Sequence, residues 1–232
     1  MCGRFAIAIR AETLRQVFGV ADVAAEMLPR FNVAPGQDIA AIRVEDGEKR
    51  LVMLRWGFPV QFPGAPQAKP LINARGETVD TKPIFRDAFR NRRCLVPANG
   101  FYEWQAKGRG PKQPFFVRPK NGEPFAMAGI WERTKDVSGK SVDCVAIVTC
   151  EANAFLRPLH ERMPVVLMPA DWDVWLSGSP EEAKALIRTA PDDFFEAYPV
   201  GFGVNRAANE GPGLVLPAPT EQARTHRQRD LF

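Results

Sequence analysis

RRCLVPANGFYEWQ, residues 92–105, is the stretch that decides the fold of this chain. Two of its segments, Arg93–Val96 and Gly100–Gln105, are short, apolar and rich in aromatic residues, which is typical of strands. Further runs of this kind lie on both sides, at Ile39–Val44, Arg50–Trp56, Pro114–Arg118, Phe125–Arg133 and Ser141–Cys150. Strands therefore predominate without a βαβ rhythm. We predict an α+β fold, a single domain built on a mixed or antiparallel, barrel-like β-sheet core with peripheral helices.

The remaining segments set the limits of this domain. Ala11–Phe18 has the apolar spacing of a short amphipathic helix, and Pro83–Asn91 places Phe85 and Phe89 on one helical face. The segments RFNVAPGQD (30–38) and 57–70 have the Pro and Gly content of loops. From residue 210 the sequence turns to Pro, Gly and Arg. We therefore expect a folded domain over 1–209 and a flexible tail over 210–232.

Composition bounds the function classes. The formal charge of +4 and pI near 9.0 allow an anionic partner without requiring one. Cys94, Cys144 and Cys150 lie in apolar runs, where a buried inert thiol is the default. The sequence opens without a signal peptide, lacks a membrane-spanning run and offers no ligand-spaced cluster for a metal. We expect a cytoplasmic protein without a cofactor and without membrane contact.

Cys2 follows the initiator Met1 and precedes Gly3. Removal of Met1 would leave an α-amine and a thiol on adjacent carbons, and such an amine has a pKa of about 7.7–8.0. This aminothiol can condense with an aldehyde to close a thiazolidine ring. Alternatively, the thiolate can attack an ester or amide as an acyl-transfer nucleophile. A third interpretation is that Cys2 is merely a small residue opening an apolar strand.

Three polar side chains stand in otherwise apolar surroundings. His160 is the only histidine before the tail, so it is either a structural residue or the acid/base partner that Cys2 needs. Glu103 either faces solvent from its strand or shuttles protons from an apolar pocket. Asn73 either pairs with backbone or orients a substrate oxygen.

Arg4, Arg75 and Arg162 lie within two residues of Cys2, Asn73 and His160, respectively. Arginines at these positions indicate a substrate that bears phosphate. Aromatic residues offer bases a stacking surface or fill the core: Trp56 is expected in the core, whereas both roles stay open for Phe62, Phe101 and Trp104.

These motifs recur together in order. MCGRF, FNVAPGQ, RWG, LINARGET, CLVPANGFYEW, QPFF, VTCEAN, LHERMPVVL and a late GVN resemble the SOS-response-associated peptidase (SRAP) family from Cys2 to about Asn205. The resemblance implies a domain that binds single-stranded DNA and joins covalently to abasic sites, with possible autopeptidase and lyase-like activity.

The family's roles map onto positions of this chain. Cys2 matches the crosslinking residue, Asn73 the residue that holds the opened sugar, Glu103 the acid/base glutamate and His160 the catalytic histidine. Arg4, Arg75 and Arg162 resemble the DNA-contacting arginines, and Trp104 is expected beside the DNA. The chain departs from the family after its WG motif, where Phe62 replaces the usual tryptophan and is expected to stack instead.

Two further interpretations concern activity and partners. The rival activity is a thiol peptidase or amidohydrolase with Cys2 as nucleophile, limited to autoproteolytic removal of Met1. The chain ends Gln228-Arg229-Asp230-Leu231-Phe232, which resembles the short motif that docks bacterial repair proteins on the sliding clamp. Gln228, Leu231 and Phe232 would be its anchors. We expect a monomer that acts on the nucleoid at sites of damage.

Overall fold

The computed structural model describes residues 2–21, 28–59, 70–106, 110–135 and 139–219. Its core is a closed five-stranded barrel in the order β10–β4–β3–β6–β9, closed by the pairing of β9 with β10. These strands are β3 (Asp38–Glu45), β4 (Glu48–Trp56), β6 (Arg93–Ala98), β9 (Phe125–Lys135) and β10 (Ser141–Glu151). Within this ring, β10 and β4 are parallel and every other neighbouring pair is antiparallel, so the barrel is mixed. The predicted single α+β domain with a barrel-like core is confirmed.

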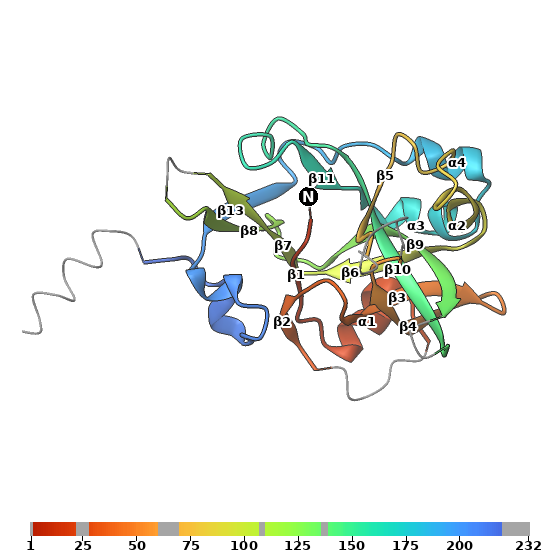
Figure 1. The fold of residues 1–232 in the computed structure, drawn as a ribbon, viewed down its shortest axis with the longest axis horizontal. Helices are drawn as coiled ribbons and strands as arrows, with labels where there is room; N and C mark the ends of the chain where they lie inside the picture. Colours follow the sequence, from red (N-terminus) through yellow and green to blue (C-terminus); the bar gives the residue numbers. More distant parts are fainter. Residues whose placement is uncertain (1, 22–27, 60–69, 107–109, 136–138, 220–232) are drawn as a thin grey trace, which may run out of the picture.

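A second, antiparallel sheet lies beside the barrel in the order β13–β8–β7–β1–β2 (Figure 1). Its strands are β1 (Phe5–Ile7), β2 (Arg30–Val33), β7 (Gly100–Gln105), β8 (Gln113–Pro119) and β13 (Phe195–Pro199). The chain passes from barrel to sheet between β6 and β7. Gly100 lies at this crossing, where a Cβ would meet the Phe116 ring at 2.3 Å and the Val117 carbonyl oxygen at 2.6 Å. Glycine is therefore required for β7 and β8 to pair this closely.

One apolar core joins the two sheets. Trp56 is fully buried, packs edge-on against Phe5 with ring centroids 5.2 Å apart, and donates from Nε1 to the Ile72 carbonyl at 3.0 Å. Phe101 packs against Phe195 in the same way. The expectation that Trp56 is a core residue is confirmed, and the open alternative for Phe101 is settled in favour of the core.

The helices are short and peripheral (Figure 1). Helix α1 (Ala11–Phe18) has the predicted bounds and buries Leu14 and Phe18, whereas α2 (Arg86–Asn91) is shorter than expected. Phe85 and Phe89 are buried, as their spacing predicts. The others are α3 (Trp172–Ser177), α4 (Pro180–Ala185) and the 3-10 turns η1 (Pro169–Asp171), η2 (Phe202–Asn205) and η3 (Pro212–Val215).

Three short strands pair with barrel strands from outside the ring: β5 (Asn73–Arg75), β11 (Arg162–Pro164) and β12 (Val166–Leu167). β5 pairs in parallel with β10, so that Asn73 is opposite Ile147 and Arg75 is opposite Thr149. β11 pairs antiparallel with the end of β10. The long strand β10 thus brings together the two segments that carry Asn73 and His160.

Two predictions about loops are wrong. Arg30–Val33 is not a loop but β2, because its backbone pairs with β1 ahead of the turn at Pro35-Gly36. The flexible tail does not begin at residue 210. Glu210 accepts hydrogen bonds from the backbone N–H of Phe31 at 2.8 Å and from the Arg30 side chain at 3.2 Å. The chain then forms η3, and the backbone N–H of Ala218 donates to the Pro199 carbonyl at 2.8 Å.

In the described part of the chain, no helix combines the length and apolarity that crossing a membrane would need.

Candidate active site

Cys2 lies at the entry to β1 and is fully buried. The segment that follows Cys2 pairs with β7 of the second sheet: Phe5 is opposite Phe101, and the backbone N–H of Tyr102 donates to the Arg4 carbonyl at 2.9 Å. The pairing with β7 therefore fixes the first residues in the body of the protein.

Asn73 reaches Cys2 directly. Its Nδ2 donates to the Cys2 carbonyl oxygen at 3.1 Å, so the side chain does pair with backbone. Its Oδ1 is also buried, and no donor among the described residues reaches it. A buried acceptor in this state favours a ligand that can donate a hydrogen bond. The two alternatives for Asn73 are thus compatible, one for each end of the amide.

Glu103 does not face solvent, since only 4% of it is exposed. It lies on β7 opposite Phe115. Burial raises the pKa of the Cys2 thiol, and the nearby Glu103 carboxylate raises it further. Phe5 pairs with Phe101 and the Tyr102 N–H bonds the Arg4 carbonyl, so Glu103 follows on β7 beside the segment that leads back to Cys2.

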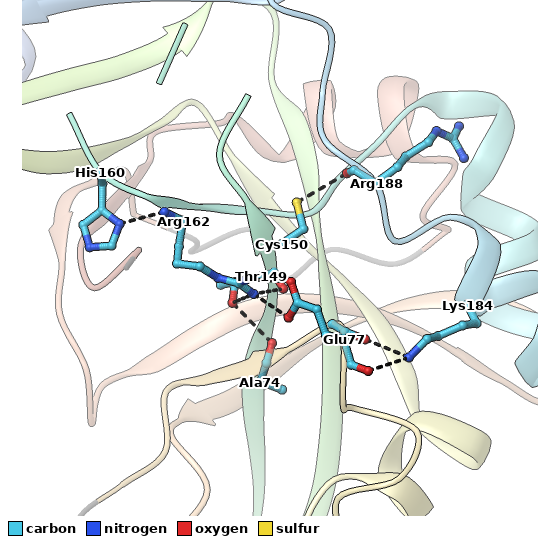
Figure 2. A network of polar contacts seen from close by, with 9 residues as sticks. Ala74, Glu77, Thr149, Cys150, His160, Arg162, Lys184 and Arg188 are labelled. Carbon is cyan, nitrogen blue, oxygen red and sulfur yellow. Dashed lines mark hydrogen bonds and ion pairs between the residues drawn. The ribbon is translucent and has the colours of Figure 1, made fainter. Parts of the chain in front are cut away.

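His160 closes the turn that follows β10 and is half-buried. Its Nδ1 accepts a hydrogen bond from the backbone N–H of Arg162 at 2.9 Å (Figure 2). A neutral imidazole that accepts at Nδ1 carries its proton on Nε2. The turn is tied to β7 as well, because Gln105 Nε2 donates to the Pro158 carbonyl at 3.3 Å. The loop of His160 is therefore anchored to the strand of Glu103.

The three arginines differ in their surroundings. Arg4 donates to Asn32 Oδ1 at 2.8 Å and to the Val204 carbonyl at 2.7 Å, and its guanidinium lies 6.0 Å from the Trp104 ring centroid. Trp104 is half-buried, and its Nε1 donates to Asn205 Oδ1. Arg4 and Trp104 thus lie together, next to the segment that carries Asn205.

Arg75 and Arg162 lie on the two short strands that pair with β10. Arg75 is exposed at the end of β5. Arg162 instead forms a forked ion pair with Glu77, at 2.6 and 2.9 Å, and donates to the Thr149 carbonyl at 2.7 Å (Figure 2). Arg75 is the more accessible of the two to an incoming phosphate. Phe62 lies outside the described residues.

Sequence reasoning missed three residues that support this site: Asn32, Glu77 and Gln105. Asn32 is fully buried and donates to the carbonyls of Arg206 and Asn209 while accepting from Arg4. Glu77 stands two residues after Arg75 in a turn, where a carboxylate is unremarkable. No local signal distinguishes these residues, because their partners are distant in sequence.

The chain matches the family model described as SOS response associated peptidase (SRAP) over residues 1–207. It is 33% identical to the abasic site processing protein YoqW of Bacillus subtilis, covering 93% of this chain and 99% of that protein. It is 32% identical to the abasic site processing protein YedK of Escherichia coli, covering 94% and 100%.

Solved structures agree on the fold. A protein from Bacteroides thetaiotaomicron superposes with a TM-score of 0.81 at 23% identity, covering 94% of this chain and all of that one. A protein from Bordetella bronchiseptica gives a TM-score of 0.73 at 26% identity, covering 87% of this chain. The chain belongs to the SOS response associated peptidase family.

Proposed function

We propose that this protein binds single-stranded DNA at an abasic site and forms a covalent thiazolidine crosslink with it through Cys2, after removal of Met1. The observation that carries the proposal is the hydrogen bond from Asn73 to the carbonyl of the buried Cys2, beside the strand that holds the buried Glu103. Its relatives YoqW and YedK bear the name abasic site processing protein, which supports the choice of substrate.

The chemistry begins with the sugar. An abasic sugar equilibrates between a closed hemiacetal and an open aldehyde, and only the aldehyde reacts with an aminothiol. As the C1′–O4′ bond breaks, His160 Nε2 can pass its proton to the ring oxygen and take up the proton that leaves the C1′ hydroxyl, so that the aldehyde forms and the imidazole ends neutral. The open sugar then bears a hydroxyl group, and the buried Oδ1 of Asn73 can accept a hydrogen bond from it.

Ring closure follows in two bond-forming steps. The Cys2 amine attacks the aldehyde carbon, and loss of one water gives an imine. The Cys2 sulfur then attacks the imine carbon, while the thiol proton passes through Glu103 to the imine nitrogen. Aldehyde and aminothiol thus become thiazolidine and water, with no oxidant or cofactor consumed. Holding the reacting groups together supplies the proximity that a free cysteine lacks.

The thiol of Cys2 bears on the choice between crosslinking and peptidase activity. A thiol peptidase needs a thiolate near neutral pH, which requires a lowered pKa beside a cation. Here burial and Glu103 raise the pKa of the Cys2 thiol. An amine-first reaction, with a neutral thiol as second nucleophile, does not require a lowered pKa of this thiol. Autopeptidase activity is confined in this proposal to removal of Met1, and lyase-like activity to β-elimination from the imine.

DNA contacts are assigned to residues on both sheets. Arg4 and Trp104 take the backbone and a base, and Arg75 takes a phosphate. Arg162 and Phe62 complete the proposed set, the former from its ion pair with Glu77 and the latter from the segment outside the described residues. The protein is proposed to act as a monomer at damaged DNA of the nucleoid.

Docking on the sliding clamp through Gln228, Leu231 and Phe232 is proposed from the sequence alone, since these residues lie outside the described ones. A labelled peptide of residues 224–232 should bind the clamp of the same organism in fluorescence anisotropy. A peptide with both Leu231 and Phe232 replaced by alanine should not. Equal binding of the two peptides would exclude this docking mode.

The experiment that tests the main proposal is intact mass spectrometry after incubation with single-stranded DNA that contains one abasic site. The expected product has the mass of the Met1-free protein plus the DNA minus one water, and it survives heating. The matched control is the same strand with the sugar reduced at C1′, which has no aldehyde and should give no adduct. An adduct of the same mass on Cys2→Ala protein would refute the assignment.

A further inference from the structure

The ion pair between Glu77 and Arg162 joins two elements that carry different parts of the active site. Glu77 lies in the turn after β5, the strand of Asn73 and Arg75, whereas Arg162 begins β11, just after His160. The two side chains meet through both carboxylate oxygens, with NH1–Oε1 at 2.6 Å and NH2–Oε2 at 2.9 Å (Figure 2). A forked pair of this kind fixes direction as well as distance.

The turn that carries Glu77 is held in place by hydrogen bonds to its backbone. The backbone N–H of Gly76 donates to the Thr149 carbonyl at 2.7 Å, and Lys184 Nζ donates to the Gly76 carbonyl at 2.9 Å. A Cβ on Gly76 would meet Ile187 Cγ2 at 2.3 Å, so the turn is pressed against its neighbours. The carboxylate of Glu77 therefore projects from a rigid turn, and it can hold the Arg162 guanidinium in one place.

The Arg162 end reaches the imidazole. Its guanidinium is bound to Glu77 and to the carbonyl of Thr149, and its side chain is only 11% exposed. The backbone N–H of the same residue donates to His160 Nδ1 at 2.9 Å. Fixing the Arg162 side chain thus fixes the backbone donor that orients the imidazole and keeps its proton on Nε2.

The sizes of two effects, on the rate of crosslinking and on the stability of the fold, distinguish a residue that positions His160 from one that only stabilises the protein. The side chain of Glu77 is 48% exposed, and an ion pair of this exposure contributes little to folding. A displaced catalytic group, in contrast, slows a reaction on the order of 10- to 100-fold. A large kinetic effect with a small effect on stability would therefore be the signature of positioning.

We propose that Glu77 is a positioning residue that orients His160 for opening of the abasic sugar, acting through Arg162. The inference rests on the proposed function. It adds a residue that contacts neither the sugar nor the DNA in the mechanism above, and it couples the strand of Asn73 to the turn of His160.

The test measures single-turnover adduct formation as a function of DNA concentration. Glu77→Gln should lower the maximal rate about 10- to 100-fold while leaving the half-saturating DNA concentration nearly unchanged. Glu196→Gln is the matched control, because it removes a similarly exposed carboxylate from an arginine, Arg118, on the second sheet. It should crosslink at the wild-type rate.

A double-mutant cycle separates action through His160 from any other role. In a His160→Ala background, Glu77→Gln should cause little further loss. A full additional loss in that background would overturn the proposal, as would a wild-type maximal rate for Glu77→Gln alone. Faster crosslinking by Glu77→Gln would mean that Glu77 only screens Arg162 from DNA, and would also overturn it.

Two further arms keep the outcomes distinct. If Glu77→Gln fails to fold, Glu77→Asp keeps the charge but shortens the reach, and it should give an intermediate rate with a normal melting curve. If wild-type protein forms no adduct at all, the proposed function fails. If wild-type protein reacts and the cycle is additive, only the role of Glu77 fails.

Discussion

Replacing Asn73 with alanine separates two contributions of this side chain that act in opposite directions. The Nδ2 bond to the Cys2 carbonyl, at 3.1 Å, contributes about 1 kcal/mol to folding. The buried Oδ1, which lacks a donor among the described residues, costs about 1–3 kcal/mol. Removing both also leaves the buried Cys2 carbonyl without this donor, a cost of similar size, so the stability should stay within about 1 kcal/mol of the wild-type value.

The same substitution should slow crosslinking. Without Nδ2 the Cys2 backbone loses its tie to β5, and without Oδ1 the opened sugar loses an acceptor. We expect the adduct to form on the order of 10- to 100-fold more slowly, which corresponds to about 1.4–2.7 kcal/mol of activation free energy. A loss of rate without a comparable loss of stability is the behaviour of a residue kept for function rather than for folding.

Thermal melts and single-turnover crosslinking on the same preparations measure the two effects. For a chain of this size 1 kcal/mol moves Tm by roughly 2–4 °C, so the Asn73→Ala protein should melt within about 4 °C of the wild-type temperature. Asn91→Ala is the control, since it removes an exposed asparagine bonded to Asp87 on α2. If Asn73→Ala destabilises the protein by more than about 1 kcal/mol and crosslinks normally, Asn73 only pairs with backbone and the reasoning is refuted.

Three further predictions concern the nucleophile, the phosphate contact and pH. Cys2→Ser should form an adduct that is lost on heating unless borohydride traps it, because oxygen closes a less stable ring than sulfur; a heat-stable adduct would contradict the role of the thiol. Arg75→Ala should flatten the slope of log affinity against log salt by roughly 0.7, measured by anisotropy on intact single strands, and an unchanged slope would make Arg75 structural. Hydrogen bonding to Arg162 lowers the pKa of Glu77. Its stabilising contribution is therefore present above the unfolded pKa of about 4.3 and disappears as pH falls through the lower folded value. Wild-type protein should melt slightly above Glu77→Gln at pH 7 and equally at strongly acid pH, and a difference that grows toward acid pH would contradict this assignment.

Much of the fold could be predicted because local pattern and final structure agree. The strand runs at 93–96 and 100–105 became β6 and β7, and helix α1 kept its predicted bounds. The segment Arg30–Val33 could not be recognised, because the turn signal of Pro35-Gly36 outweighed four residues of mixed polarity. Asn32 looks like a loop residue, yet it is buried because Arg4 and two distant carbonyls satisfy its amide.

The candidate site was predictable as a set of residues but not as a geometry. Cys2 and Asn73 meet only because β1 joins the second sheet while β5 pairs with β10. The partnership of Glu77 with Arg162 likewise depends on β10, whose Thr149 faces Arg75 on one side and Pro164 on the other. These contacts follow from how the barrel closes, and no local spacing carries that information.

Glu103 is the residue whose position could have been decided from the sequence. Successive side chains of a strand point to opposite faces, so Phe101 and Glu103 share one face of β7 while Tyr102 and Trp104 share the other. Phe101 belongs to the main core between the sheets, and Tyr102 packs in a separate cluster on the outer side with Trp104 against it. Once Phe101 is assigned to the core, alternation places Glu103 inside as well. A carboxylate on the core face of a central strand is costly to bury, which makes Glu103 a candidate for the proton transfer proposed above.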